Sequence, residues 1–151
     1  MSLQTDIKAQ IKDAMIAKDA MRLLVLRGLS AAFVNELVAV RRRPDEELQD
    51  TEAIIIIARE ARKRKDSIEQ FEKGGRKDLA DTERAELAIL ETFLPPQMSY
   101  EEVLKFVMQK QSETGMNDKA KVGQFMGSIM ADLRGKVEGK VVKRAIDSLF
   151  S

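Results

Sequence analysis

The chain has 151 residues, of which 44% are hydrophobic and 34% are charged, so it can bury the core of one domain or of two small ones. Its 26 Lys and Arg residues nearly balance its 25 Asp and Glu residues, and the net charge of +1 excludes a general attraction to nucleic acid or anionic membranes. Cysteine and histidine are absent, which excludes disulfides, thiolate or imidazole metal sites, cysteine nucleophiles and histidine-based triads. The sequence therefore predicts no catalytic residues, no metal site and no cofactor.

The start of the chain and its longest aliphatic run bear on localisation. The first residues lack the basic and then apolar pattern of a signal peptide, and the run from residue 53 to 58 is far too short to span a bilayer. The absence of cysteine suits a reducing compartment. Together these features predict a cytoplasmic protein with no membrane partner.

Apolar residues recur at helical spacing from the first residues onward, and strand-like alternation never persists. A stripe at every fourth position from Leu3 to Met15 predicts a first helix. Asp19 is placed to cap a second helix, which we expect to run to about Arg43 because Pro44 and the acidic residues after it break the pattern.

A third and a fourth helix are predicted in the middle of the chain. Asp50 or Thr51 can cap the third helix, and Gly74-Gly75 ends it. The fourth helix follows and stops sharply at Pro95-Pro96. The predicted buried stripe of the third helix consists of Ile54, Ile57, Ala61, Ile68 and Phe71.

Pro95-Pro96 is also the predicted domain boundary, because a complete helix-start signature follows it. Ser99 and Glu102 form a capping box three residues apart, just before a new apolar stripe. The chain is therefore divided into a helical N-terminal domain, residues 1–95, and a C-terminal domain, residues 96–151.

Three helices are predicted in the C-terminal domain. The fifth helix ends at Gly115, Asn117 or Asp118 caps the sixth, and Gly135 closes the sixth. The seventh begins at about Gly139. The predicted fold is all-α, with a four-helix N-terminal part followed by a small three-helix domain.

Two glycines in the predicted sixth helix form its most distinctive pattern. Gly123 and Gly127 are four residues apart and so share one helix face, where a second helix backbone can approach closely. Met126 and Met130 lie beside them and offer adaptable apolar contacts. We predict a helix-packing or docking face from Gly123, Met126, Gly127 and Met130, with Gly135 and Gly139 marking the helix ends.

Three motifs spread over the chain carry a resemblance to a known family. They lie at residues 64–71, 94–99 and 123–139. In letters they read RKDSIEQF, LPPQMS and GQFMGSIMADLRGKVEG. The chain resembles the YqeY-like proteins, which are similar to the tail region of the B subunit of the tRNA-dependent amidotransferase.

This resemblance implies a helical first part, a three-helix second part and a role as a tRNA-contacting appendage. The catalytic parts of the amidotransferase have no counterpart in the chain. Gly123, Gly127 and Lys136 match the family pattern, whereas Gln124 stands where relatives commonly have lysine and Lys143 where they have asparagine. These departures move positive charge along the C-terminal part of the chain.

Seven Lys and Arg residues lie between Gly115 and the end of the chain, against four acidic residues. With the resemblance, this local excess predicts contacts to RNA phosphates, which weaken steeply as salt rises. The alternative is a solvated basic face without a ligand. The candidate RNA contacts are Lys119, Lys121, Arg134, Lys136, Lys140 and Lys143.

A second basic cluster lies on the predicted third helix. Arg59, Arg62 and Lys63 share a face there and predict a ridge that a tRNA could contact as well. The alternative is a charged helix exterior with ion pairs at i to i+4 spacing, each worth only a few tenths of a kcal/mol.

Three functions from different classes are compatible with these features. The first is a non-catalytic module that binds tRNA or a tRNA-bound enzyme. The second is a helical adaptor that docks on a protein through the glycine and methionine face. The third, implied by family similarity alone, is a carbon-nitrogen ligase with glutamine as amido-N-donor. We favour the first, because neither a nucleotide-binding loop nor a nucleophile is recognisable.

Overall fold

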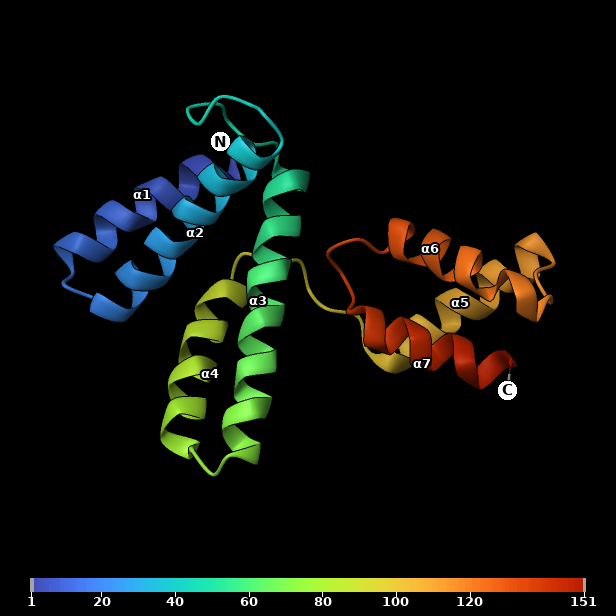
Figure 1. Cartoon of the computed structure of the whole chain (residues 1–151). Coiled ribbons are helices and arrows are strands. Elements are labelled where there is room, and N and C mark those ends of the chain that lie inside the picture. The colour runs from blue at the N-terminus through green and yellow to red at the C-terminus, as the bar shows by residue number, and fades with distance from the viewer. Residues whose placement is uncertain (1, 151) are drawn as a thin grey trace. The chain divides into compact units, whose positions relative to one another are not determined.

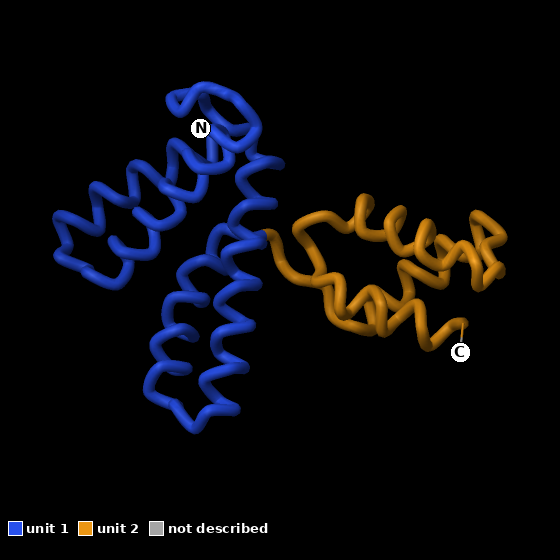
Figure 2. Tube along the Cα trace, in the orientation of Figure 1, with its two compact units in different colours: residues 1–94 blue, residues 95–151 orange. Residues whose placement is uncertain are grey.

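The computed structural model describes residues 2–150, and these residues form seven α-helices and one short 3-10 helix, with no strand among them (Figure 1). The predicted all-α class is thus confirmed. The chain divides into two compact units, Met1–Leu94 and Pro95–Ser151, which we call unit 1 and unit 2 (Figure 2). No helix within residues 2–150 has the length and apolar character needed to cross a membrane.

Unit 1 is built from four helices that pack in pairs. These are α1 (Leu3–Ile16), α2 (Ala20–Ala39), α3 (Asp50–Lys73) and α4 (Lys77–Glu91). Helix α1 lies against α2, and α3 lies against α4 (Figure 1). One core joins the two pairs, because α2 also packs on α3 and α4.

The core of unit 1 is centred on one side of α2. Phe33, Leu26, Leu29 and Leu37 of this helix are almost fully buried. The α3 residues that face them are buried only in the first half of that helix. The predicted α3 stripe was therefore wrong in part, since Ala53, Ile56, Ile57 and Ala61 are buried while Ile54, Ile68 and Phe71 are half-buried. Buried aliphatic side chains of this kind contribute about 1.5 to 3 kcal/mol each.

Two predicted helix ends in unit 1 also need correction. Helix α2 stops at Ala39 and not near Arg43, because Arg41 adopts a left-handed conformation with φ of 62° and the Arg42 N–H turns back to bond the Leu37 carbonyl at 2.8 Å. Helix α3 is capped by Gln49, which forms a capping box with Glu52, and not by Asp50 or Thr51. By contrast, Asp19 caps α2 as predicted and accepts a bond from the Arg22 N–H at 3.1 Å.

Unit 2 contains α5 (Tyr100–Thr114), the 3-10 helix η1 (Lys119–Lys121), α6 (Val122–Asp132) and α7 (Gly139–Phe150). Its core is separate from that of unit 1 and includes Val103, Val107, Ile129, Val142 and Ile146. Helix α7 packs against both α5 and α6. Unit 2 thus buries its own apolar residues.

Capping residues and glycines set the helix ends of unit 2. Ser99 caps α5 and accepts a bond from the Glu102 N–H at 3.2 Å. Asp118 caps η1 by accepting from the Ala120 N–H at 2.9 Å, so a 3-10 turn precedes α6, which the sequence did not predict. Gly115 ends α5 with φ of 66°, a left-handed conformation that favours glycine.

Candidate nucleic-acid interface

Four of the six predicted RNA contacts of unit 2 lie at the two ends of one helix, α6. Lys119 and Lys121 belong to η1, immediately before α6, whereas Arg134 and Lys136 follow its last turn. Helix α6 has 11 residues, which corresponds to a length of about 16 Å. The structure therefore does not bring these four residues into one cluster, and a ligand that contacts both groups must extend along α6.

The Arg134 and Lys136 end of unit 2 is fixed by the segment that precedes α5. The Gln97 side-chain amide donates to the Gly135 carbonyl at 3.0 Å, and the Met98 N–H donates to the Lys136 carbonyl at 2.9 Å. Gly135 itself has φ of 80°, a left-handed turn that suits glycine. This turn holds the backbone of the two basic residues in place while their side chains remain exposed.

Helix α7 adds a third basic group to unit 2. Lys140, Lys143 and Arg144 are spaced three and four apart and are all exposed, so they share the outer face of the helix. The Arg144 guanidinium lies 4.1 Å from the centre of the Tyr100 ring. This cation–π contact holds the guanidinium in place and leaves its charge unneutralised.

Tyr100 was missed as a site residue by sequence reasoning. It lies 44 positions before Arg144 in the sequence, and no pattern connects the two positions. Only the packing of α5 against α7 brings them together.

The six predicted RNA contacts of unit 2 differ from the basic cluster of α3 in having no acidic partner among the described residues. None of the six predicted contacts forms an ion pair with any residue from 2 to 150. Lys110 does form an ion pair, with Asp132, but it is not one of the predicted contacts. The positive charge of these six side chains is therefore available to an external anion.

The predicted ridge on α3 is largely neutralised. Arg59 pairs with Glu36 of α2 at 3.1 Å, and Lys63 pairs with Glu60 at 3.2 Å. Arg62 is exposed and forms no ion pair with the described residues. In this region the structure supports the charged helix exterior more than an RNA-binding ridge.

Arg64, in the same basic run, has a structural role. It contacts Glu83 at 3.0 Å and Glu86 at 2.5 Å, both on α4. The Glu86 side chain is only 10% exposed, and this guanidinium is a cationic partner for its nearly buried carboxylate. Arg64 therefore joins α3 to α4.

The two glycines of α6 do not pack against another helix of the described residues, although the methionines beside them do contact the core of unit 2. A Cβ placed on Gly123 or Gly127 would meet no atom within 4 Å, so the prediction of a close intramolecular helix approach is wrong at these two positions. Met126 and Met130 are half-buried and pack on the core of unit 2. Gly139 lies close to Met130, whose methyl carbon would be 3.9 Å from a Cβ there. Docking of an external partner on this face stays a prediction.

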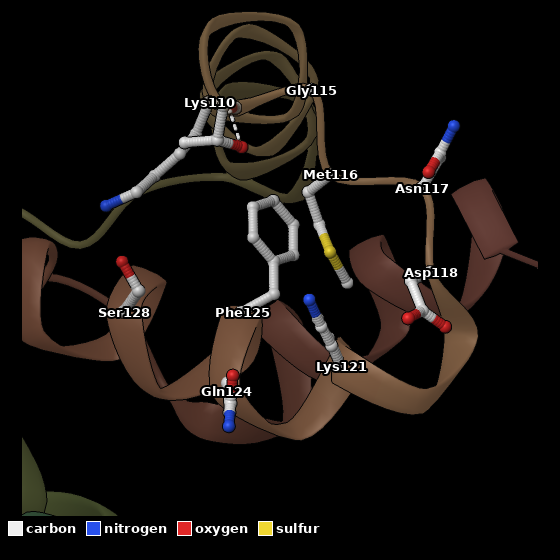
Figure 3. Close-up of a pocket in the computed structure, with 10 residues that line it drawn as sticks. Lys110, Gly115, Met116, Asn117, Asp118, Lys121, Gln124, Phe125 and Ser128 are labelled. Atoms are coloured by element: carbon white, nitrogen blue, oxygen red, sulfur yellow. Dashed lines mark hydrogen bonds between the residues drawn. The ribbon is translucent and has the colours of Figure 1, made fainter.

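A cleft of about 380 Å³ opens between the end of α5 and the start of α6 (Figure 3). Phe125 and Met116 form its apolar part, and Lys121 brings an ammonium group to it, whereas the Lys110 ammonium is paired with Asp132. The Asp118 carboxylate also lines the cleft and is already engaged in capping η1. No group of three or more acidic side chains within residues 2–150 is placed to hold a metal ion. The cleft therefore offers cationic and apolar contacts next to the predicted residue Lys121.

The carboxylates of the loop before α3 are accounted for by local bonds. The pKa of Glu46 is lowered, first by its hydrogen bond from Arg42, which lies 2.8 Å away. The pKa of Glu47 is also lowered, first by a hydrogen bond from Ser2 and then by one from Thr5. Both groups hold the loop against its neighbours.

These features define a small all-helical protein whose second unit carries an unpaired basic surface. A family model described as "Yqey-like protein" matches residues 4–150. The chain therefore belongs to the YqeY-like family, as the resemblance of its motifs indicated.

Curated relatives carry the name "Altered inheritance of mitochondria protein 41, mitochondrial". The protein from Kluyveromyces lactis is 33% identical over 126 residues, which cover 79% of this chain and 66% of the relative. That from Lachancea thermotolerans is 35% identical over 91 residues, or 59% of this chain and 46% of the relative. That from Saccharomyces cerevisiae strain YJM789 is 26% identical over 130 residues, which cover 82% of this chain and 68% of the relative.

The chain thus spans about half to two thirds of the length of these relatives. Their names also contradict the predicted localisation. They are described as mitochondrial proteins, and the prediction of a cytoplasmic protein is wrong on this comparison. The features used for it, a missing signal-peptide pattern and the absence of cysteine, do not distinguish these two compartments.

Proposed function

We propose that the chain is a non-catalytic module that binds tRNA, or an enzyme carrying tRNA, through unit 2. The observation that supports this proposal is that the six predicted basic contacts of unit 2 form no ion pair with any residue from 2 to 150. We assign the activity to the second of two domains, residues 1–95 and 96–151, with a four-helix and a three-helix arrangement. Binding by such a surface is mainly electrostatic, because each phosphate contact releases a bound counterion.

The arrangement of the basic side chains suits a backbone ligand. Two basic groups lie at opposite ends of α6, Lys119 and Lys121 before it and Arg134 and Lys136 after it. The length of the helix separates the two groups by about 16 Å, a distance that a stretch of several nucleotides can bridge. Arg144, stacked on Tyr100, presents its donors at a fixed position on α7. The site therefore recognises phosphate position rather than base sequence.

A tRNA gel shift over a salt series tests this proposal, with an unrelated RNA of similar length as the control. We expect a complex at low salt that weakens steeply as salt rises, since the logarithm of the binding constant falls by about 0.9 per phosphate contact for each tenfold rise in salt. Absence of any complex with tRNA at low salt would refute the proposal.

Charge reversal locates the surface. The double variant Arg134→Glu/Lys136→Glu should lower the tRNA affinity by at least about tenfold and reduce the salt slope by about 2. Lys63→Glu makes a charge reversal of the same kind on α3, and it should leave the affinity within about twofold. Equal losses from the two changes would show that net charge alone, and not the surface of unit 2, governs binding.

A second candidate function rests on the open glycine face of α6. Gly123 and Gly127 lie on an exposed helix face with no neighbour within 4 Å, which suits a protein partner whose helix approaches closely. A Gly127→Leu variant should then lose a partner that the wild-type chain retains, whereas Lys136→Glu should retain it. If Lys136→Glu loses that partner and Gly127→Leu does not, the adaptor function is wrong.

A further inference from the structure

The exposed apolar residues of the chain are concentrated around α2. Eight large hydrophobic side chains among the described residues are exposed, and seven of them lie between residues 15 and 40. Four belong to α2, where Met21 and Val34 are 39% exposed, Val38 is 55% exposed and Leu24 is 64% exposed. They lie on the side of the helix opposite the buried Phe33. One side of α2 is therefore apolar and uncovered.

The remaining exposed positions of α2 are mostly small. Ala20, Gly28, Ala31 and Ala39 are exposed, and only Arg27 and Asn35 interrupt the apolar surface. A solvent-facing helix side normally carries charged residues, as it does on α3 and α4. We define the α2 face as Met21, Leu24, Gly28, Ala31, Val34 and Val38.

The few charges of α2 are engaged within unit 1. Its three charged residues are Arg22, Arg27 and Glu36. Arg22 and Glu36 bond to side chains of α1 and α3, and Arg27 reaches the sulfur of Met15 at 3.8 Å. Of these three, only Glu36 is neutralised by an ion pair, with Arg59, whereas Arg22 and Arg27 bond to uncharged groups and keep their charge. The six side chains of the α2 face are themselves uncharged and match an apolar protein surface, with the Arg27 guanidinium beside them.

Gly28 has no explanation within its own chain. It stands in the middle of a 20-residue helix, where glycine is disfavoured, and a Cβ there would meet no atom within 4 Å. Together with Ala31 it leaves a low region halfway along the α2 face, with larger side chains toward both ends. Such a profile lets a second helix come close at the centre.

The α2 face can be paired with an antiparallel copy of itself. A copy of α2 turned about a twofold axis between Gly28 and Ala31 places Gly28 opposite Ala31, Met21 opposite Val38 and Leu24 opposite Asn35. We propose that two copies of the chain associate through the α2 face in this antiparallel arrangement. An interface in which the same patch serves both subunits is the isologous type, which needs this kind of self-complementarity.

The exposed area is sufficient for such a dimer. Met15, Ile16 and Val40 extend the α2 face at its two ends and are 53%, 73% and 53% exposed. With them, the exposed apolar side chains amount to roughly 700 Å² per copy, close to the about 800 Å² per partner of a standard protein interface. Antiparallel pairing brings Val40 of one copy toward the start of α2 in the other, where Met15 and Ile16 lie.

The first experiment measures the mass of the full chain by light scattering and by sedimentation velocity over about 1 to 100 µM. We expect the wild type to shift from monomer to dimer in this range, and Leu24→Glu to raise the dissociation constant at least about tenfold. Met108→Glu is the matched control, because Met108 is 50% exposed but belongs to α5 in unit 2. Leu24→Glu should retain the helical content of the wild type, since the side chain is exposed.

The second experiment fixes the orientation by disulfide cross-linking, because the chain has no native cysteine. Residues 21 and 38 are 17 positions apart, or about 25 Å along the helix. Antiparallel pairing therefore predicts dimer cross-links in Met21→Cys/Val38→Cys and none in either single variant. Cross-linking of both single variants would indicate parallel pairing and would overturn the proposed arrangement.

Two further outcomes would overturn the proposal as a whole. One is a wild type that stays monomeric up to the highest concentration, or a dimer that Leu24→Glu leaves intact. The other is a monomer that co-floats with vesicles of neutral and anionic phospholipid and loses this property in Leu24→Glu, which would make the α2 face a lipid contact. Neither result depends on tRNA binding, because Leu24→Glu leaves unit 2 unchanged.

Discussion

The basic cluster on α3 and the basic surface of unit 2 have similar sequence patterns and different surroundings. Arg59 and Lys63 each have a carboxylate about 3 Å away, and Arg64 has two. Lys136 and its neighbours in unit 2 have none among the described residues. A concentrated run of Lys and Arg therefore offers less free positive charge to an external anion than a looser set whose charges are unpaired.

The difference follows from what lies across from each group. Helices α2 and α4 place Glu36, Glu83 and Glu86 next to α3, so the basic cluster there stabilises the packing of unit 1. In unit 2, Asp118 caps η1 and Asp132 pairs with Lys110. These two carboxylates thus have other partners and form no ion pair with the predicted contacts.

The largest expected effect comes from breaking the α3 cluster at Arg64. Arg64→Ala leaves two carboxylates of α4 close together, one of them nearly buried, and should lower the free energy of unfolding of unit 1 by about 2 to 3 kcal/mol. Urea unfolding of the full chain measures the loss. Arg62→Ala, two positions away and exposed, is the control and should change the free energy by less than about 0.5 kcal/mol. A similar loss in both variants would contradict a specific role of Arg64.

A smaller effect is expected from releasing the paired cations of α3. The double variant Glu36→Gln/Glu60→Gln removes the partners of Arg59 and Lys63, and should raise tRNA affinity by about two- to threefold with a steeper salt dependence. A gel shift over a salt series measures both quantities. The same gain from Glu113→Gln/Glu91→Gln, which releases neither Arg59 nor Lys63, would mean that net charge and not pairing controls affinity.

Removing the contact between Arg144 and the Tyr100 ring in unit 2 should change the tRNA affinity by a similar or smaller factor. Tyr100→Leu removes the ring under Arg144 without a change of charge, and a cation–π contact at such a site is worth about 0.5 to 1 kcal/mol. We expect a two- to fourfold loss of tRNA affinity. Tyr100→Phe keeps the ring and should bind like the wild type, so a loss there would point to the hydroxyl instead.

The smallest expected effect concerns the acid stability of unit 1. Hydrogen bonds from Ser2 and Thr5 lower the pKa of Glu47 in the folded chain. Its contribution to stability is therefore present above the unfolded pKa and is lost as the pH falls through the folded pKa, below about pH 4. Glu47→Gln should flatten the fall of the thermal midpoint in this range, whereas a steeper fall would contradict the assignment.

Many helix ends could be predicted from the sequence, because capping residues and glycines near each end determine them. Asp19, Ser99 and Gly115 act as the helix ends that their residue types indicate. The end of α2 was not predictable, because it depends on the left-handed Arg41 and on the bonds of Arg42 to Glu46 and Glu52. Helix η1 was missed for a similar reason, since a 3-10 turn has no periodic pattern of its own.

The candidate site was less predictable than the fold. The six basic residues of unit 2 could be identified from the sequence. Their lack of acidic partners among the described residues could not. The contact between Tyr100 and Arg144 has no sequence signature. The α2 face did leave a signal, because α2 has only three charged residues in 20, whereas 34% of the whole chain is charged.

The sequence by itself determined the all-helical class, the order of the helices and membership of the YqeY-like family. These properties follow from apolar periodicity, capping residues and motifs, which act over a few neighbouring positions. Only the tertiary structure decided which charges are neutralised, which glycines face open space and which side of α2 is uncovered. Those properties depend on residues far apart in the chain, whose proximity is set by packing.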